Sequence, residues 1–277
     1  CGSGGASANQ ARDGGKGFLG IREEVVERAE TRNQRTEFMK EMEMACTECV
    51  RSRFLPELER IATETLGERP GSAGWMEFQI GAHTHSPVIL FHYPSHEGTG
   101  FEYLKRSVKL EFGSLTDQRP SGTHAVRPWV AEVFPKLFED FRCDAVFLDL
   151  ERTFWEKATI LHAEAHRDRA RHLRDRYSRH YSDMAALSRH ATAERALARK
   201  DLRKRVAEWK SRFFAARWAR YDLVMVGTFH LVPPAFRLVE LEKDYRAMRD
   251  MFLVEPPPFE SVVESIRDLE KRIQQTT

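Results

Sequence analysis

A change in the spacing of apolar residues limits what this chain can fold into. Between residues 21 and 66, apolar side chains recur mostly every three or four positions, which is the period of an amphipathic helix. Residues 103–112 instead alternate polar and apolar side chains, as a strand with one buried face does. From Arg152 onward the helical period returns. These three stretches predict an α+β fold, with a small sheet ahead of a group of helices.

Turn residues and prolines mark the ends of the predicted elements. Residues 88–93 are apolar and β-prone between two prolines, so we expect them to pair in antiparallel fashion with residues 103–112. Residues 143–150 provide a third strand. The predicted helices of the second half span residues 152–176, a segment that includes 183–189, then 193–221, 235–252 and 259–275. The sequence therefore predicts a small mixed or antiparallel sheet with flanking helices, followed by a C-terminal helical bundle.

Composition places the chain among globular proteins. With 277 residues, 41% of them hydrophobic and 31% charged, it is long enough to bury a sizeable core. We expect a flexible, glycine-rich tail at residues 1–17, a sheet-containing domain at 18–150 and a helical domain at 151–277. No apolar run approaches the roughly 20 residues that cross a bilayer, and no signal-peptide pattern is present. We therefore expect a cytoplasmic protein with no membrane partner.

Positive charge is concentrated in one part of the chain. The formal net charge is only +2, yet residues 166–220 contain 14 Arg and 3 Lys against 6 acidic residues. Such a local excess favours a surface that faces a polyanion. The alternative is a set of solvated helix faces whose charges pair four residues apart.

Two pairs of residues with metal-binding side chains lack the context of a zinc site. Cys46 and Cys49 form a C-x-x-C within a helical pattern, and the chain has no second pair at that spacing. His162 and His166 lie four apart, but the glutamate between them is not in the position of an H-E-x-x-H motif. We expect two buried thiols on a helix, and no zinc at the histidines.

The predicted strand at residues 108–112 carries Lys109 and Glu111 on one face, opposite its apolar side chains. Alone, this K-x-E pattern is also typical of a solvated strand face. Downstream stand, in order, RTFWEKATILH at residues 152–162, RHYSD at 179–183 and WARYD at 218–222. This ordered series resembles the AbiEii/AbiGii family of bacterial nucleotidyltransferases, the toxins of toxin–antitoxin and phage-abortive infection systems. The resemblance covers nearly the whole chain.

The resemblance implies transfer of an NMP from an NTP to a hydroxyl of RNA, such as a tRNA end, or of a protein, with a cognate antitoxin as partner. It implies that Glu111 binds Mg²⁺ and helps to deprotonate the hydroxyl. Lys157 matches the helical lysine of the family, whose implied role is to face the triphosphate. Lys109 and Arg179 are candidate substrate-binding residues. Asp183 is a candidate catalytic residue that orients Lys157 or Arg179.

The same resemblance implies a further metal motif, a G-G or G-S followed by D-x-D, ahead of residue 18. The sequence has no D-x-D upstream of residue 60. A single carboxylate is too little anionic ligation for Mg²⁺. We therefore expect the 277-residue chain by itself to be inactive or nearly so.

Two other functions stay open on the sequence. One is a non-catalytic remnant that keeps the nucleotide-facing and basic surfaces and binds an antitoxin or nucleic acid. The other is a helical nucleic-acid-binding protein in which the K-x-E pattern is incidental. The latter predicts binding that weakens steeply with salt and does not respond to NTP. The enzyme instead predicts loss of transfer in Glu111→Ala or Lys157→Ala with the fold intact.

Overall fold

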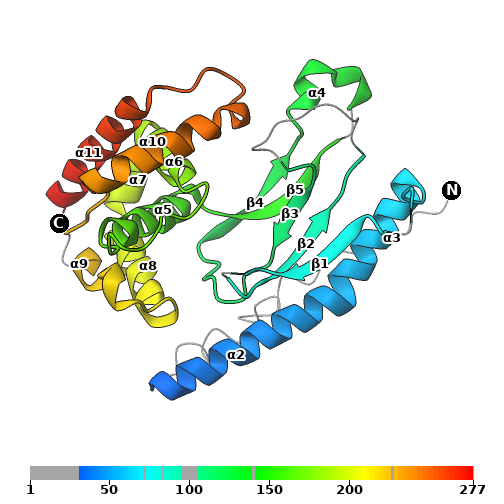
Figure 1. The fold of residues 1–277 in the computed structure, drawn as a ribbon, viewed down its shortest axis with the longest axis horizontal. Coiled ribbons are helices and arrows are strands. Elements are labelled where there is room, and N and C mark those ends of the chain that lie inside the picture. The colour runs from blue at the N-terminus through cyan, green and yellow to red at the C-terminus, as the bar shows by residue number, and fades with distance from the viewer. Residues whose placement is uncertain are drawn as a thin grey trace. The chain divides into compact units, whose positions relative to one another are not determined.

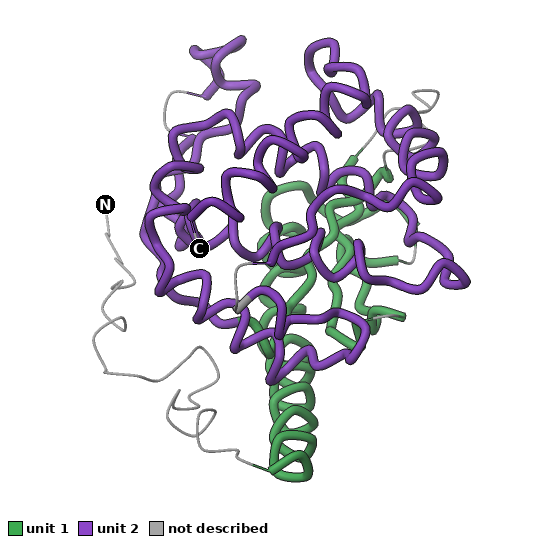
Figure 2. Tube along the Cα trace, turned by 90° about the vertical axis from the view of Figure 1, so that its left-hand side faces the viewer, with its two compact units in different colours: residues 1–116 green, residues 117–277 purple. Residues whose placement is uncertain are grey.

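The computed structural model describes residues 31–71, 73–82, 84–94, 105–138, 141–225 and 228–276. The chain forms two compact units, residues 1–116 and 117–277, which are coloured separately in Figure 2. The expected tail at residues 1–17 lies outside the described residues, and the expected domain division after residue 150 stays a prediction. Within the described part of the chain, no helix is both long and apolar enough to span a membrane.

A long helical segment opens the first unit (Figure 1). It runs through α2 (Arg32–Cys49), a π-helical turn (Val50–Phe54) and α3 (Leu55–Leu66). The predicted long helix is confirmed over these three elements, while residues 21–30 lie outside the described residues.

Local signals set both ends of this helical segment. Thr31 and Gln34 form a capping box, in which Gln34 N donates to Thr31 Oγ1 at 3.2 Å and Thr31 N donates to Gln34 Oε1 at 3.0 Å. At the other end, Gly67 has a φ of +79°, a conformation that glycine adopts without steric cost.

Three antiparallel strands follow, in the order β1 (Met76–Ile80), β2 (Pro87–Phe91) and β3 (Val108–Glu111). The predicted pairing of residues 88–93 with 103–112 is confirmed by the β2–β3 register. The first strand was not predicted. Its five residues, MEFQI, do alternate apolar and polar side chains, but the run is short and the strand is mostly exposed.

The sheet and the helical segment of the first unit share one core. Cys46, Val50 and Ile89 form its buried centre. Partly buried apolar side chains pack around them, from Phe54, Leu55, Leu58, Met76, Phe78, Leu110 and Phe112. The Cys46 thiol donates to the Phe112 carbonyl over 3.8 Å. Cys46 is thus a buried helical thiol as predicted, whereas Cys49 is only half-buried.

The second unit begins with a two-stranded antiparallel pair, β4 (Ser121–Val126) and β5 (Cys143–Leu148). The short helix α4 (Val130–Val133) and a 3-10 turn (Pro135–Leu137) lie between them in the chain. The strand predicted at residues 143–150 is confirmed over Cys143–Leu148, where it pairs with β4 and not with β2 or β3. The strand β4 was not predicted, because its residues are mostly small or polar and it is largely exposed.

Helices make up the rest of the second unit. They are α5 (Leu150–Ala165), α6 (Ser178–Arg189), α7 (Thr192–Ala198), α8 (Lys200–Phe213), α9 (Tyr221–Met225), α10 (Leu238–Ala247) and α11 (Phe259–Gln275). Short 3-10 turns lie at Arg217–Ala219, Ala235–Arg237 and Arg249–Met251. The bounds of α11 are those predicted. The mixed strands and helices confirm the α+β class.

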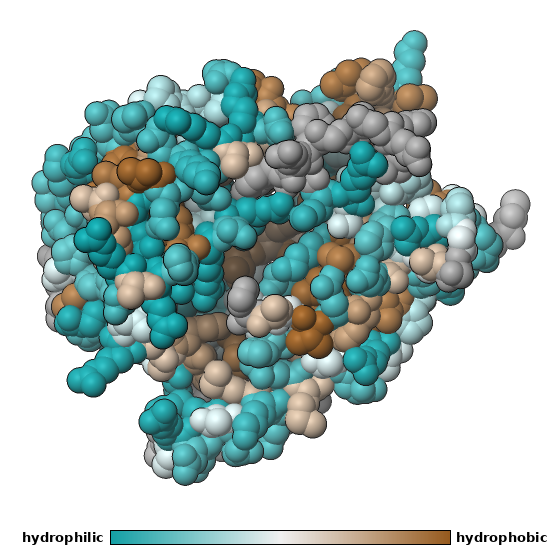
Figure 3. All heavy atoms as spheres, viewed as in Figure 1, coloured by the Kyte–Doolittle hydropathy of each residue, from teal (hydrophilic) through white to brown (hydrophobic). Residues whose placement is uncertain are grey.

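Two helix predictions were wrong in extent. The helix expected to reach residue 176 ends at Ala165, because the polar stretch that follows offers no apolar stripe to bury. The helix expected over residues 193–221 is instead α7 and α8, followed by the 3-10 turn at Arg217–Ala219 and the start of α9. The central helix α5 packs against α6, α7 and α8, and it buries the large side chains of Phe154 and Trp155. Hydrophilic residues cover much of the helical face turned to the viewer in Figure 3.

Candidate active site

Lys109 and Glu111 lie on one face of β3, because side chains two residues apart on a strand point the same way. The ammonium nitrogen of Lys109 is 2.7 Å from Oε2 of Glu111. Thr84, just before β2, donates from its hydroxyl to Oε1 of Glu111 at 2.9 Å. The Glu111 side chain keeps 37% of its surface exposed, so solvent and solutes reach a carboxylate whose two oxygens are both engaged.

Glu111 is the carboxylate that the sequence assigned to Mg²⁺. Among the described residues, no group of three or more His, Cys, Asp or Glu side chains is placed to hold a metal ion. The Lys109 ammonium also occupies one oxygen of the Glu111 carboxylate. The described residues therefore do not form a magnesium site by themselves.

A second group of predicted residues lies where α5 meets α6. The ammonium of Lys157, on α5, is 2.6 Å from Oδ2 of Asp183, on α6. It also lies 3.4 Å from Nδ1 of His180, one turn earlier on α6. The Lys157 side chain keeps 23% of its surface exposed. Two side chains of α6 thus hold an ammonium group that remains open to solvent.

His180 is neutral at neutral pH. Burial is the largest cause that lowers its pKa to about 4, and the charges of Lys157 and Arg179 lower it further. Because an ammonium group only donates hydrogen bonds, Nδ1 of His180 is the acceptor and its proton is on Nε2. The Tyr177 ring contacts the imidazole edge-on, with ring centroids 5.0 Å apart. The sequence had assigned no role to His180.

Arg179 is exposed on α6, four residues before Asp183. The sequence left two partners open for Asp183, and the structure pairs it with Lys157. Arg179 instead acts on His180 through its charge. The structure therefore brings Lys157 and Asp183 together with His180 within the second unit, and Lys109 with Glu111 and Thr84 within the first.

Comparison with protein families gives a match over most of the chain. The family model described as "Nucleotidyl transferase AbiEii toxin, Type IV TA system" matches residues 21–266. The chain belongs to this family. All of the site residues predicted from the sequence fall inside the matched range of this AbiEii-family chain. Comparisons with curated proteins and with solved structures gave no match.

The AbiEii-family chain also contains a buried ion network that the sequence did not predict. Arg152, whose side chain is fully buried, lies 2.5 Å from Oδ2 of Asp117 and 2.5 Å from Oε1 of Glu156. Lys210 lies 2.6 Å from the other Glu156 oxygen, and Arg205 lies 2.7 Å from Asp117. The four-residue spacing of Arg152 and Glu156 was visible in the sequence. The part that Asp117 plays in the network could not be predicted from the sequence, because Asp117 stands 35 residues before its partner Arg152.

Proposed function

We propose that this AbiEii-family protein transfers a nucleoside monophosphate from an NTP to a hydroxyl group of RNA. In that reaction the hydroxyl oxygen bonds to the α-phosphorus and pyrophosphate leaves. The task of the protein is then to position phosphates and to neutralise their charge. The observation that carries the proposal is the Lys157 ammonium, held in place by Asp183 and by neutral His180.

The geometry at Lys157 suits a triphosphate oxygen. An ammonium group has three N–H donors, and its contacts with Asp183 and His180 account for two of them. The remaining donor is available to a ligand because the side chain is part exposed. A compact ammonium is a natural partner for a phosphate oxygen. We infer that Lys157 binds the triphosphate and that Asp183 positions it.

The choice of RNA as acceptor rests on charge. Residues 166–220, which include α6, α7 and α8, hold 17 basic against 6 acidic residues. A polyanion is attracted to such a segment. We propose that Glu111, exposed on β3, is the carboxylate that accepts the proton of the attacking hydroxyl.

Nucleotide binding tests the proposal directly. We would measure the affinity of the 277-residue chain for radiolabelled NTPs in the presence of Mg²⁺. Lys157→Ala should weaken binding about tenfold or more, because a hydrogen bond to a charged group is lost. The control is Lys204→Ala, which removes an exposed lysine that faces Glu208 at 3.7 Å on α8. Equal affinity in Lys157→Ala and wild type would rule out the proposed role.

Transfer of labelled NMP to RNA tests the chemistry separately. We expect weak transfer by the 277-residue chain, because it has no D-x-D upstream of residue 60. Glu111→Ala should remove the transfer that remains. The binding assay, applied to the same variant, shows separately whether its affinity for NTP has changed. Robust transfer by the wild type would show the prediction of low activity to be wrong. Unchanged transfer by Glu111→Ala would show that Glu111 is not the proton acceptor.

A further inference from the structure

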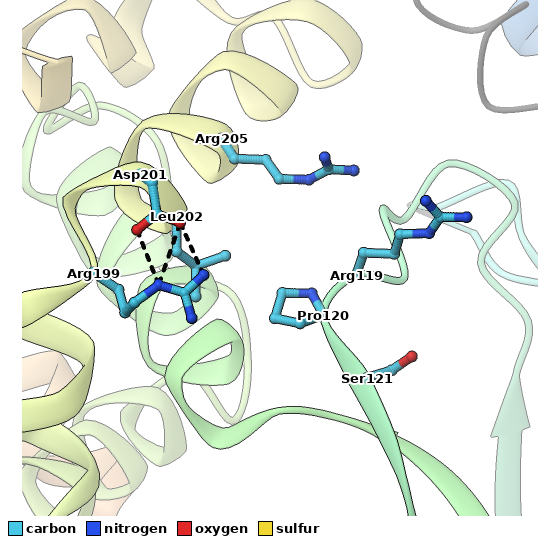
Figure 4. A pocket seen from close by; sticks show the side chains of 7 residues that line it. All are labelled: Arg119, Pro120, Ser121, Arg199, Asp201, Leu202 and Arg205. Carbon is cyan, nitrogen blue, oxygen red and sulfur yellow. Dashed lines mark hydrogen bonds and ion pairs between the residues drawn. The ribbon is translucent and has the colours of Figure 1, made fainter.

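The second unit contains a cavity of about 480 Å³ that lies apart from the residues assigned above. Its walls come from the segment that enters β4 and from the start of α8, which face each other across the opening in Figure 4. The lining residues are Arg119, Pro120, Ser121, Arg199, Asp201, Leu202 and Arg205. A volume of this order is typical of sites for small ligands or ligand groups.

The charges around the cavity favour an anion. Three arginines are among its lining residues, against one aspartate. That carboxylate, Asp201, is held by Arg199 through Nε at 2.9 Å and Nη2 at 2.8 Å. These contacts use two of the five N–H donors of Arg199, which is half exposed, so the guanidinium has donors for a second acceptor. The first turn of α8 adds the partial positive charge of a helix N-terminus.

A buried framework holds the walls of this cavity in place. Asp117, which is 3% exposed, binds both Arg205 of the cavity wall and Arg152 of α5. Arg152 also donates to the backbone carbonyl of Arg119 at 2.7 Å. Burial opposes ionisation of Asp117, but hydrogen bonds from Arg205 and Arg152 outweigh it and hold its pKa below the usual range. The arginine walls are therefore preorganised before any ligand binds.

The residues of α5 that support the cavity lie on a different face of the helix from Lys157. Arg152 and Glu156 are four residues apart, so they share the face that supports the cavity. Lys157 follows Glu156 directly, which places it about 100° further around the helix, and its contacts are with α6. A ligand group in the cavity is therefore separate from one held by Lys157.

We propose that this cavity is a phosphate-binding site that takes a phosphate of the substrate at a position distinct from Lys157. The proposal rests on the proposed function for the identity of the substrate. The phosphate group that binds there has two candidate sources, the backbone of the acceptor RNA and the NTP. Planar guanidinium groups that bind two oxygens at once are well matched to either. The basic stretch at residues 166–220, of which Arg199 and Arg205 are part, favours the RNA backbone.

Two variants with opposite expected effects test the site on the full 277-residue chain. Arg199→Ala removes a cavity donor and should weaken the affinity for a labelled single-stranded RNA about tenfold. Asp201→Asn removes the one lining carboxylate and should strengthen it several-fold, an effect that misfolding does not produce. The matched control is Lys204→Ala, which takes an equal charge from α8, the helix that follows Arg199, but does not line the cavity.

Salt titrations and an NTP arm identify the source of the phosphate. For RNA, loss of one phosphate contact should reduce the slope of log affinity against log salt by about 0.7 in Arg199→Ala. If only NTP affinity responds to the two cavity variants, the site holds a nucleotide phosphate. If neither RNA nor NTP affinity responds to them, the proposal is overturned. Because these measurements require neither Lys157 nor transfer, a failure here is distinct from a failure of the proposed function.

Discussion

The carboxylate of Asp183 lies 2.6 Å from the ammonium of Lys157 and joins two helices through residues 26 positions apart in the chain. Both side chains are reachable from solvent, so the pair itself contributes little to stability. The pair instead fixes the position of the Lys157 ammonium, which also contacts the neutral imidazole of His180.

The first prediction concerns this pair and NTP binding. Removing a carboxylate would by itself strengthen the binding of an anion, so weaker binding in Asp183→Asn reports a loss of positioning. We expect NTP affinity to fall several-fold in Asp183→Asn, and not to fall further when Asp183→Asn is added to Lys157→Ala, because both variants act on one interaction. Tighter NTP binding by Asp183→Asn, measured in the same assay, would contradict a positioning role.

The second prediction concerns the buried ion network. Asp117→Ala leaves the fully buried Arg152 without one of its carboxylate partners. We expect the free energy of unfolding in urea to fall by about 3–5 kcal/mol. The control is Asp268→Ala, which breaks an exposed pair with Lys271 and should cost less than about 1 kcal/mol. Similar losses in both variants would mean that burial does not amplify the interaction.

The third prediction compares two isoleucines of the same sheet. Ile89, on β2, is fully buried in the core of the first unit, whereas Ile80, on β1, is 44% exposed. Ile89→Ala should cost about 2–5 kcal/mol of unfolding free energy because it leaves a cavity. Ile80→Ala makes the same chemical change and should cost far less. Denaturation followed by circular dichroism distinguishes the two, and equal costs would show the core to be placed wrongly.

The fourth prediction concerns pH. His162 is fully buried, its Nε2 donates to the Arg220 carbonyl at 2.9 Å, and its Nδ1 accepts from the His230 backbone at 3.1 Å. Burial is the main cause that lowers its pKa to about 4, from an ordinary value of 6.5. The unfolded state therefore binds more protons between these values. Stability is complete above pH 6.5 and falls as the pH drops toward 4.

The contribution of His162 is on the order of 3 kcal/mol across that interval. His180, whose pKa is also lowered to about 4, acts in the same direction, so a variant is needed to separate them. His162→Gln should flatten the dependence of unfolding free energy on pH between 6.5 and 4, although it also lowers stability at pH 7. A variant as pH-sensitive as the wild type would show that His162 is not responsible.

Elements with a strong local period were predictable from the sequence. The bounds of α11 were obtained correctly, because Phe259 follows three prolines and apolar residues then recur at helical spacing. The pairing of β2 with β3 was predicted from a short apolar run and a run of alternating polar and apolar residues. In contrast, β4 was missed, since its small and polar residues become a strand only by pairing with β5. The helix that contains α5 was predicted to extend too far, beyond Ala165. A run of charged residues is compatible with a helix but does not by itself require one.

The sequence by itself determined the α+β class, the family and the residue types of the candidate site, since each depends on patterns within a few residues or on ordered motifs. Only the tertiary structure decided which of those residues meet. Asp183 reaches Lys157 from another helix, and Asp117 reaches Arg205 across 88 positions. Such contacts are set by the packing of helices around α5, and no local period encodes them. Packing also lowers the pKa of His180 and forms the arginine-lined cavity, because both require groups distant in sequence to exclude water together.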